Sequence, residues 1–189
     1  MSADQSHNAQ QWMTNWIEQV VVGEGLCPFA RHSLSTLRVF ATKSTTPAAV
    51  LMDVQRELNV LLNEPATKVS TSILVVPAGL DDFTVYLDML ELIELALEDT
   101  GLRGEIQVAS FHPDYCFEGA TDDDPANWTN RSPVPAFHFL REEHVSEARS
   151  RHDGVESIPQ RNINHFRSLG LGHVKAMLRA CYGVDDVSD

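Results

Sequence analysis

The residues best suited to chemistry lie in one stretch without a periodic hydrophobic pattern, residues 111–132. It follows a predicted strand, and α/β proteins commonly bind ligands at the carboxyl ends of strands. Long connections of this kind are uncommon in compact domains and are often functional. His112 can exchange a proton near neutral pH, and Asp114 could orient its imidazole. We therefore predict His112 and Asp114 as catalytic residues and Tyr115 as a substrate-binding residue. The alternative is that Pro113 and Asp114 form a turn and His112 caps backbone groups.

A second polar group closes the same stretch, Asn130-Arg131-Ser132, and prolines follow it. The planar guanidinium of Arg131 suits a carboxylate or phosphate, and Asn130 and Ser132 add hydrogen-bonding groups. We predict that these three residues bind an anionic substrate. The alternative is that Arg131 pairs with one acid of the run 122–124 and closes the loop on itself. In that acidic run, Asp122 or Asp123 is expected to form a turn or helix cap before Pro125 rather than a cation site.

Cys27 is a third candidate, since it precedes Pro28 at a predicted helix start. The positive end of a helix favours the thiolate, which is the form that acts as a nucleophile or redox group. Cys-Pro-Phe resembles the start of the active site in glutaredoxin-like and glutathione-transferase-like proteins. The context departs from that pattern, because Ala30 stands where a second cysteine would be and no strand precedes. The alternative is a small buried cysteine at a chain turn.

By residue type alone, a metal site could be formed by Cys27, His32, His112, Cys116 and His138. No pair has the close double spacing of a zinc ribbon, and the proline after His112 argues against placing Cys116 one helical turn away. We therefore predict no metal ligands. His138 falls within an apolar strand, where a satisfied core or edge histidine is the expected outcome.

Composition limits the class of protein. The 189 residues, 43% hydrophobic and 22% charged, predict one folded domain. The N-terminus is polar, the three cysteines give no disulfide framework, and no apolar run reaches membrane-spanning length, so a cytoplasmic protein without a secretory signal is expected. The net charge of −13 opposes nucleic acid and membranes as partners and leaves a small anionic molecule suspected. Cofactor and oligomeric state are not indicated.

Hydrophobic periodicity predicts the elements that position these residues. Residues 70–76 form an apolar run that predicts a strand buried on both faces. Thr46 and either Asp81 or Asp82 are expected to cap helices, and residues 1–8 and 184–189 to be frayed tails. The predicted helices are 9–22, 47–62, 83–98, 143–152 and 158–182, the last broken or kinked near Gly170, and the predicted strands are 36–41, 70–76, 105–111 and 136–141.

This order predicts a single-domain α/β (or α+β) protein, with a four-stranded mixed sheet and helices packed on it. Strands joined by helices of such length favour parallel crossovers. A ferredoxin-like split arrangement is the alternative.

Four segments together resemble a bacterial family of domains of unknown function, family 1415. They are Leu26-Cys27-Pro28-Phe29-Ala30, Ser110-Phe111-His112-Pro113-Asp114-Tyr115, Thr129-Asn130-Arg131-Ser132-Pro133 and Leu140-Arg141-Glu142. The resemblance covers nearly the whole chain, from about Trp12 to Tyr182. It implies a full-length single domain and little chemistry. The family pattern often has another residue in place of Cys116, which speaks against a catalytic or metal role for that cysteine.

The leading hypothesis is an enzyme acting on a small anionic metabolite. Arg131 with Asn130 would hold the anionic group, His112 would move a proton with Asp114 orienting it, and Cys27 would be the nucleophile or redox partner. This hypothesis requires that all three motifs share one pocket. The alternatives are a non-catalytic module that binds a metabolite or a protein, and a metal-binding protein.

Overall fold

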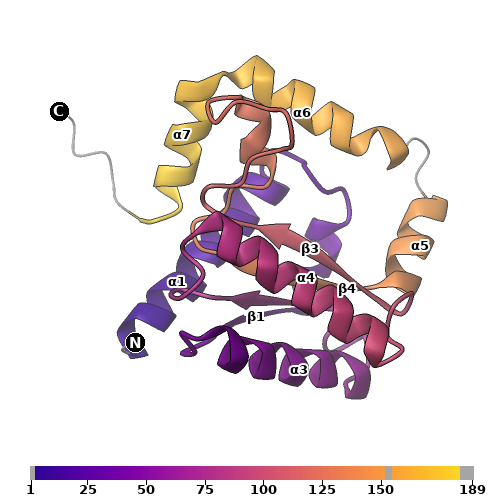
Figure 1. The fold of residues 1–189 in the computed structure, drawn as a ribbon. Coiled ribbons are helices and arrows are strands. Elements are labelled where there is room, and N and C mark those ends of the chain that lie inside the picture. Colours follow the sequence, from indigo (N-terminus) through magenta and orange to yellow (C-terminus); the bar gives the residue numbers. More distant parts are fainter. Residues whose placement is uncertain (1–2, 152–154, 184–189) are drawn as a thin grey trace.

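The computed structural model describes residues 3–151 and 155–183 and shows a four-stranded mixed sheet (Figure 1). The strand order is β1-β2-β4-β3, with β1 parallel to β2 and β4 antiparallel to both of its neighbours. The predicted α/β fold with a mixed sheet is confirmed. The strands are β1 (Leu37–Ala41), β2 (Thr71–Val75), β3 (Ile106–Phe111) and β4 (Ala136–Arg141).

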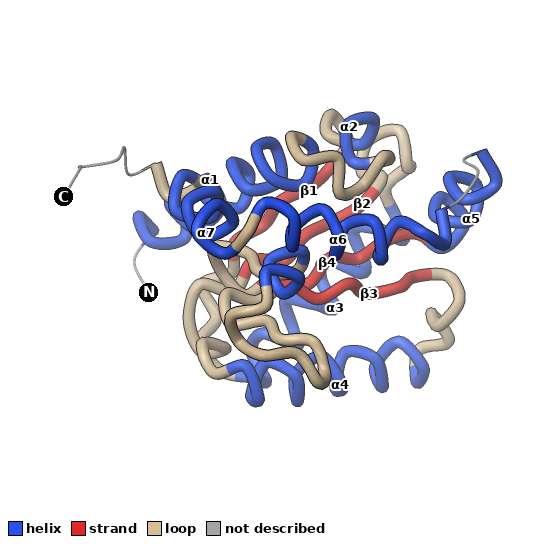
Figure 2. The backbone as a smooth tube through the Cα atoms, turned by 90° about the horizontal axis from the view of Figure 1, so that it is seen from above, coloured by secondary structure: helices blue, strands red, loops and turns tan. Residues whose placement is uncertain are grey.

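Helices cover both faces of the sheet (Figure 2). One face packs against α3 (Pro47–Asn63) and α4 (Phe83–Asp99). The other packs against α1 (Ala3–Trp16), its continuation η1 (Ile17–Val22), α6 (Ile158–Leu169) and α7 (Leu171–Ala180). The shorter helices are α2 (Ala30–Ser33), η2 (Pro125–Thr129), α5 (Glu142–Arg151) and η3 (Val155–Ser157).

The two crossovers of the sheet differ. Helix α3 joins β1 to β2, and these two strands pair directly as a parallel unit. Helix α4 joins β2 to β3, but β4 inserts between them and pairs with both. The split feature of the ferredoxin-like alternative therefore occurs once, at the second crossover, while the arrangement as a whole is the mixed sheet.

Local capping fixes where the helices of the α3–α4 face begin. Thr46 is the N-cap of α3, where its side chain accepts a hydrogen bond from the Ala49 amide, and Pro47 occupies the first turn. Asp82, rather than Asp81, caps α4 and accepts from the amides of Thr84 and Val85 at 2.8 and 3.2 Å. Both helix starts agree with the sequence prediction.

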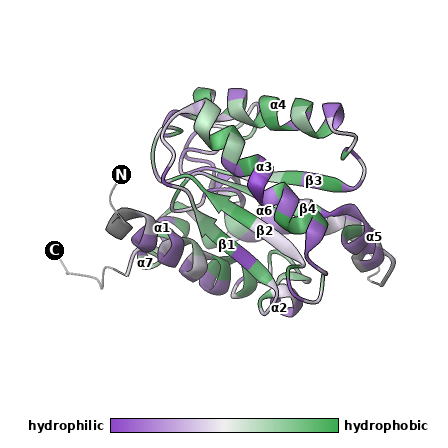
Figure 3. Cartoon of the chain, turned by 90° about the horizontal axis from the view of Figure 1, so that it is seen from below, coloured by the Kyte–Doolittle hydropathy of each residue, from purple (hydrophilic) through white to green (hydrophobic). Residues whose placement is uncertain are grey.

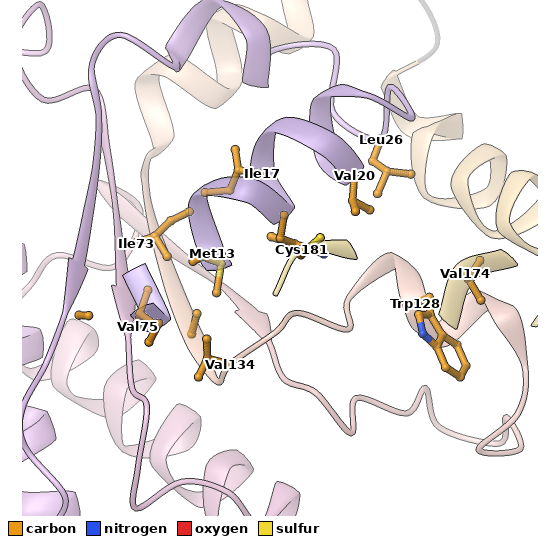
Figure 4. Packing of buried hydrophobic residues seen from close by; sticks show 14 of the residues in the cluster. Met13, Ile17, Val20, Leu26, Ile73, Val75, Trp128, Val134, Val174 and Cys181 are labelled. Atoms are coloured by element: carbon orange, nitrogen blue, oxygen red, sulfur yellow. The ribbon is translucent and has the colours of Figure 1, made fainter. Parts of the chain in front are cut away.

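Strand β2 contributes side chains to the hydrophobic cores on both faces of the sheet. All five of its residues are buried. Ile73 and Val75 point toward Met13 and Ile17 (Figure 4), and Leu74 faces the opposite core with α3 and α4. This alternation explains the unbroken apolar run in the sequence. In Figure 3 the apolar strands lie between helical layers that carry polar residues.

One helix boundary differs from expectation. Helix α1 begins at Ala3, so the predicted frayed tail is wrong for residues 3–8, and Ser6 is buried against the fold. The expected break near Gly170 is confirmed, since its φ of +80° interrupts the helical backbone between α6 and α7. Residues 184–189 and 152 lie outside the described residues. Among the described helices, none is both long and apolar enough to cross a membrane.

Candidate functional site

His112 is completely buried, and both of its ring nitrogens are hydrogen-bonded. Its Nε2 donates to the carbonyl of Leu80 at 2.9 Å, and its Nδ1 accepts from the amide of Asp114 at 3.0 Å. The ring packs between Phe83 and Tyr86 of α4. Burial lowers the pKa of His112, although the bond to Leu80 and nearby acids oppose this, so the neutral ring is favoured. The alternative predicted from the sequence, a histidine that satisfies backbone groups, describes this geometry.

Arg131 closes the loop on which it lies. Its Nε donates to the carbonyl of Tyr115 at 2.9 Å and its Nη2 to the carbonyl of Asp122 at 3.1 Å. The guanidinium also stacks on the indole of Trp128, 4.1 Å from the ring centroid. The alternative prediction, in which Arg131 closes the loop on itself, therefore agrees with the structure in the closure. It differs in the partners, which are carbonyl groups and an aromatic ring rather than the acidic side chains.

The other predicted site residues of this loop also make internal contacts. Ser132 is buried and donates to the carbonyl of Val134 at 2.6 Å, and Asn130 donates to the carbonyl of Ser110 at 3.2 Å. Tyr115 packs against Phe83, and burial raises the pKa of its phenol. The side chain of Asp114 is exposed. The loop is thus a well-bonded structural unit.

The acidic run of the loop holds it to the last helices. Asp124 caps η2 through the Ala126 amide and forms two hydrogen bonds with Arg167 of α6, at 3.0 and 2.6 Å. The guanidinium of Arg167, with the hydrogen bond from Ala126, lowers the pKa of Asp124 to about 2. A helix cap before Pro125 is therefore present, but Asp124 supplies it rather than the expected Asp122 or Asp123. Within residues 3–151 and 155–183, no three histidine, cysteine or carboxylate groups are arranged as metal ligands.

A pocket of about 800 Å³ lies on the face of the sheet that α1 and η1 cover, away from His112, which packs against α4 on the other face. We call it the sheet pocket. Residues 16–33 form one wall, β2, β3 and β4 form the floor, and the first turns of α5 form the margin. Its lining residues are Trp16, Ile17, Val21, Cys27, Phe29, Ala30, His32, Ser33, Leu37, Ser70, Thr71, Ile73, Gln107, Ala109, Phe111, His138, Leu140, Arg141, His144, Val145 and Glu147.

The chain forms the wall of the sheet pocket by a departure from regular helix. After Trp16, α1 widens into the π-helix η1, which carries Ile17 and Val21 into the wall. A hydrogen bond from the Leu26 amide to the Val21 carbonyl spans five residues and ends this segment. π-Helical turns are rare and are frequently found at functional sites.

Cys27 lies in the wall of the sheet pocket and is half-buried. The predicted helix start exists, but α2 begins at Ala30 and has only four residues. So short a helix has little dipole to stabilise a thiolate. The position of Cys27 beside a pocket, rather than a helix dipole, is what connects it with function.

His138 lies in the floor of the sheet pocket, beside a hydroxyl group that contacts both its ring and a backbone carbonyl. Its Nε2 is 2.6 Å from the hydroxyl of Thr71, and that hydroxyl is 2.7 Å from the carbonyl of Phe139. Burial lowers the pKa of His138 to about 4. Ile73 and Ala109 stand opposite it on the two neighbouring strands, and the small side chain of Ala109 leaves space above the floor.

The structure therefore separates the three predicted motifs. Cys27 lines the sheet pocket, whereas His112 packs against α4 and Arg131 lies over Trp128; neither is among the residues that line the pocket. Phe111 faces the pocket, and the next residue, His112, faces the other core. The single shared pocket that the leading hypothesis requires is not formed by these residues.

Sequence reasoning missed most of the pocket. Thr71, Gln107 and Ala109 carried no motif, and His138 was expected to be a satisfied core or edge histidine. A signal did exist, since a threonine and a histidine stand on β2 and β4, strands that are mainly apolar. Only the pairing of β2 with β4 places them together, and the sequence does not specify that pairing.

Comparisons with known proteins give a family and no chemistry. A family described as "Protein of unknown function (DUF1415)" matches residues 8–176. No curated protein and no solved structure matches the chain. The matched range includes the wall and floor of the sheet pocket as well as the loop 111–132.

Proposed function

Because the chain belongs to the DUF1415 family, whose description names no reaction, we propose from its geometry that the protein binds a small, largely apolar molecule in the sheet pocket. The observation that carries this proposal is the pocket itself. Its volume of about 800 Å³ lies in the range of roughly 300–1,000 Å³ that is usual for small-molecule sites.

The lining has the composition of such a site. The wall and floor are mainly apolar, with Ile17, Ile73, Phe111 and Leu140 among them. A few polar groups interrupt this surface, which is the pattern that fixes the orientation of a ligand. Burial of an apolar ligand against these side chains would supply the driving force, about 25 cal/mol for each Å² removed from water.

The second candidate function is catalysis, which the place of Cys27 favours. A half-buried thiol in the wall of a pocket is within reach of a bound molecule. His144 at the margin could donate a hydrogen bond to the anionic metabolite predicted from the sequence, whereas Nη2 of Arg141 already donates to backbone carbonyls at the end of α3. Catalytic roles for Cys27, His112 and Asp114, and substrate-binding roles for Tyr115, Asn130, Arg131 and Ser132, stay predictions, and the geometry supports Cys27 best.

The binding proposal is tested with indole and 2-naphthol as apolar probes, measured by thermal shift and by the fluorescence of Trp16 and the other tryptophans. At least one probe is expected to raise the Tm of the wild-type protein. Ala109→Phe fills the floor of the sheet pocket and should remove the effect. Val21→Trp fills it from the wall and serves as a second variant.

Ala48→Phe is the matched control, since Ala48 is exposed on α3 at the other face of the sheet. It should keep the full response. The proposal is overturned if neither probe shifts the Tm of the wild-type protein, or if the shift persists unchanged in both filled variants.

A further inference from the structure

In the floor of the sheet pocket, a chain of two hydrogen bonds determines which ring nitrogen of His138 carries the proton. The hydroxyl of Thr71 is 2.7 Å from the carbonyl of Phe139 and 2.6 Å from Nε2 of His138. A carbonyl oxygen can only accept, so the single hydroxyl proton of Thr71 belongs to the bond with Phe139. The remaining contact then requires His138 Nε2 to carry a proton and donate it to the hydroxyl oxygen.

This tautomer leaves Nδ1 of His138 without a proton. Neutral imidazole has one donor nitrogen and one acceptor nitrogen, and the donor is already engaged with Thr71. Among the described residues, no hydrogen-bond donor contacts Nδ1. Burial keeps the ring neutral around pH 7, because the pKa of His138 falls to about 4. The ring therefore offers an uncharged acceptor in the lining of the pocket.

The surroundings of His138 are apolar. Ile73 and Ala109 flank it across the strands, and the ring of Phe111 lies 6.4 Å away, measured between ring centroids. Water has few other partners at such a place, and an acceptor covered by an apolar ligand would lose its hydrogen bonding altogether. A ligand that supplies a donor avoids this penalty.

We infer that the ligand of the sheet pocket is an apolar molecule that carries a neutral hydrogen-bond donor, a hydroxyl or an N–H, which it gives to Nδ1 of His138. This inference rests on the proposed binding function and adds the chemical class of the ligand. His138 is thereby a specificity-determining residue, and Thr71 is the residue that positions its tautomer. A carboxylate is disfavoured at this point of the floor, because two acceptors would face each other.

The test compares each probe with its methylated counterpart, indole with 1-methylindole and 2-naphthol with 2-methoxynaphthalene, by isothermal titration calorimetry. Methylation keeps the ring system and removes the donor. The wild-type protein should bind the donor form about tenfold more tightly, the effect of one unsatisfied buried acceptor. In His138→Phe, which keeps an aromatic ring and removes Nδ1, the preference should disappear while the methylated form still binds.

Thr71→Val is the second variant. It removes the hydroxyl at nearly constant shape, so that either ring nitrogen of His138 can carry the proton. Its preference for the donor form should fall by several-fold. Thr100→Val, which removes an exposed hydroxyl that donates to the Ala96 carbonyl at the end of α4, far from the pocket lining, should change nothing.

The outcomes separate the two proposals. If no member of either pair binds the wild-type protein, the binding function itself is overturned, and this inference with it. If the donor and methylated forms bind equally well, or if 2-naphthoate binds more tightly than 2-naphthol, the pocket is a binding site but the role of His138 is overturned. Loss of the preference in His138→Phe alone, with binding retained, supports both.

Discussion

The guanidinium of Arg131 lies 4.1 Å from the ring centroid of Trp128 and also reaches the carbonyls of Tyr115 and Asp122. One side chain thus joins the first part, the acidic middle and the last part of the loop 111–132. Trp128 is itself buried, and it packs beside Val174 of α7 (Figure 4). The loop is therefore held both to itself and to the C-terminal helices.

Replacing Arg131 by lysine should lower stability more than it lowers binding to the sheet pocket. Lysine keeps the charge but loses the planar stack and the paired hydrogen bonds. We expect the free energy of unfolding in urea to fall by about 1–3 kcal/mol. Arg179→Lys, at an exposed position of α7, should have no measurable effect. Unchanged stability with weakened binding of an anion would instead restore Arg131 as a ligand residue.

Gly79→Ala should be one of the most damaging small substitutions in the chain. Gly79 has φ of +91°, and an added Cβ would lie 2.2 Å from the carbonyl oxygen of Thr45. The loops that precede α3 and α4 pass each other at this point. We expect a loss of about 3 kcal/mol or more in the free energy of unfolding, from the backbone conformation and the clash together.

Gly119→Ala separates these two causes. Gly119 also has a positive φ, +75°, but nothing lies within 4 Å of its added Cβ. It should lose only the conformational part, about 1–2 kcal/mol. Equal losses at the two positions would show that the close approach to Thr45 is unimportant.

Two histidines, the buried His112 and the half-buried His138, should make stability fall below pH 6.5. Burial lowers the pKa of His112 and brings that of His138 to about 4 in the folded protein. Below the unfolded value of 6.5, the unfolded chain binds protons that the folded chain does not. Stability is therefore complete above pH 6.5 and is lost as the pH falls from 6.5 toward 4, by up to about 1.4 kcal/mol per pH unit for each proton.

Urea unfolding at pH values from 7.5 to 4.5 measures this loss. Carboxylates titrate at the lower end, so the comparison is between the wild-type protein and His138→Gln. The variant should show a shallower decline between pH 6.5 and 5. Parallel curves for the two proteins would contradict the neutral state of the half-buried His138.

The three thiols should differ in reactivity toward iodoacetamide. Cys27 lines the sheet pocket, whereas Cys181 is fully buried, and burial raises its thiol pKa to about 11. Cys27 should be alkylated at least about tenfold faster than Cys181, as followed by mass spectrometry.

A bound probe sharpens this test. Saturating indole or 2-naphthol should slow alkylation of Cys27 and leave Cys116 unaffected, since Cys116 lies in the loop 111–132 with Ala120 and Asn127. Equal protection of both cysteines would indicate a general effect on stability. No protection of Cys27 would place the probe outside the sheet pocket.

Local patterns in the sequence predict the four strands and the longer helices of this protein. The apolar run 70–76 became the doubly buried strand β2, and Thr46 and Asp82 cap the helices that follow them. These features depend on residues within a few positions of each other, so periodicity and capping chemistry identify them. The end of the first helix at residue 22 also agrees with the prediction, but the widening into η1 does not follow from the sequence, because it leaves no mark in the hydrophobic pattern.

The place of the site was decided by tertiary structure. The sequence determined which side chains have chemical ability, and among them Cys27 does line a pocket. It did not determine that Phe111 and His112 face opposite cores, or that β4 inserts between β2 and β3 and brings His138 to Thr71. The physical reason is that strand order and facing depend on the packing of whole helices against both sides of the sheet. No local spacing records that packing, so only the folded chain separates His112, satisfied in a core, from His138, open to a pocket.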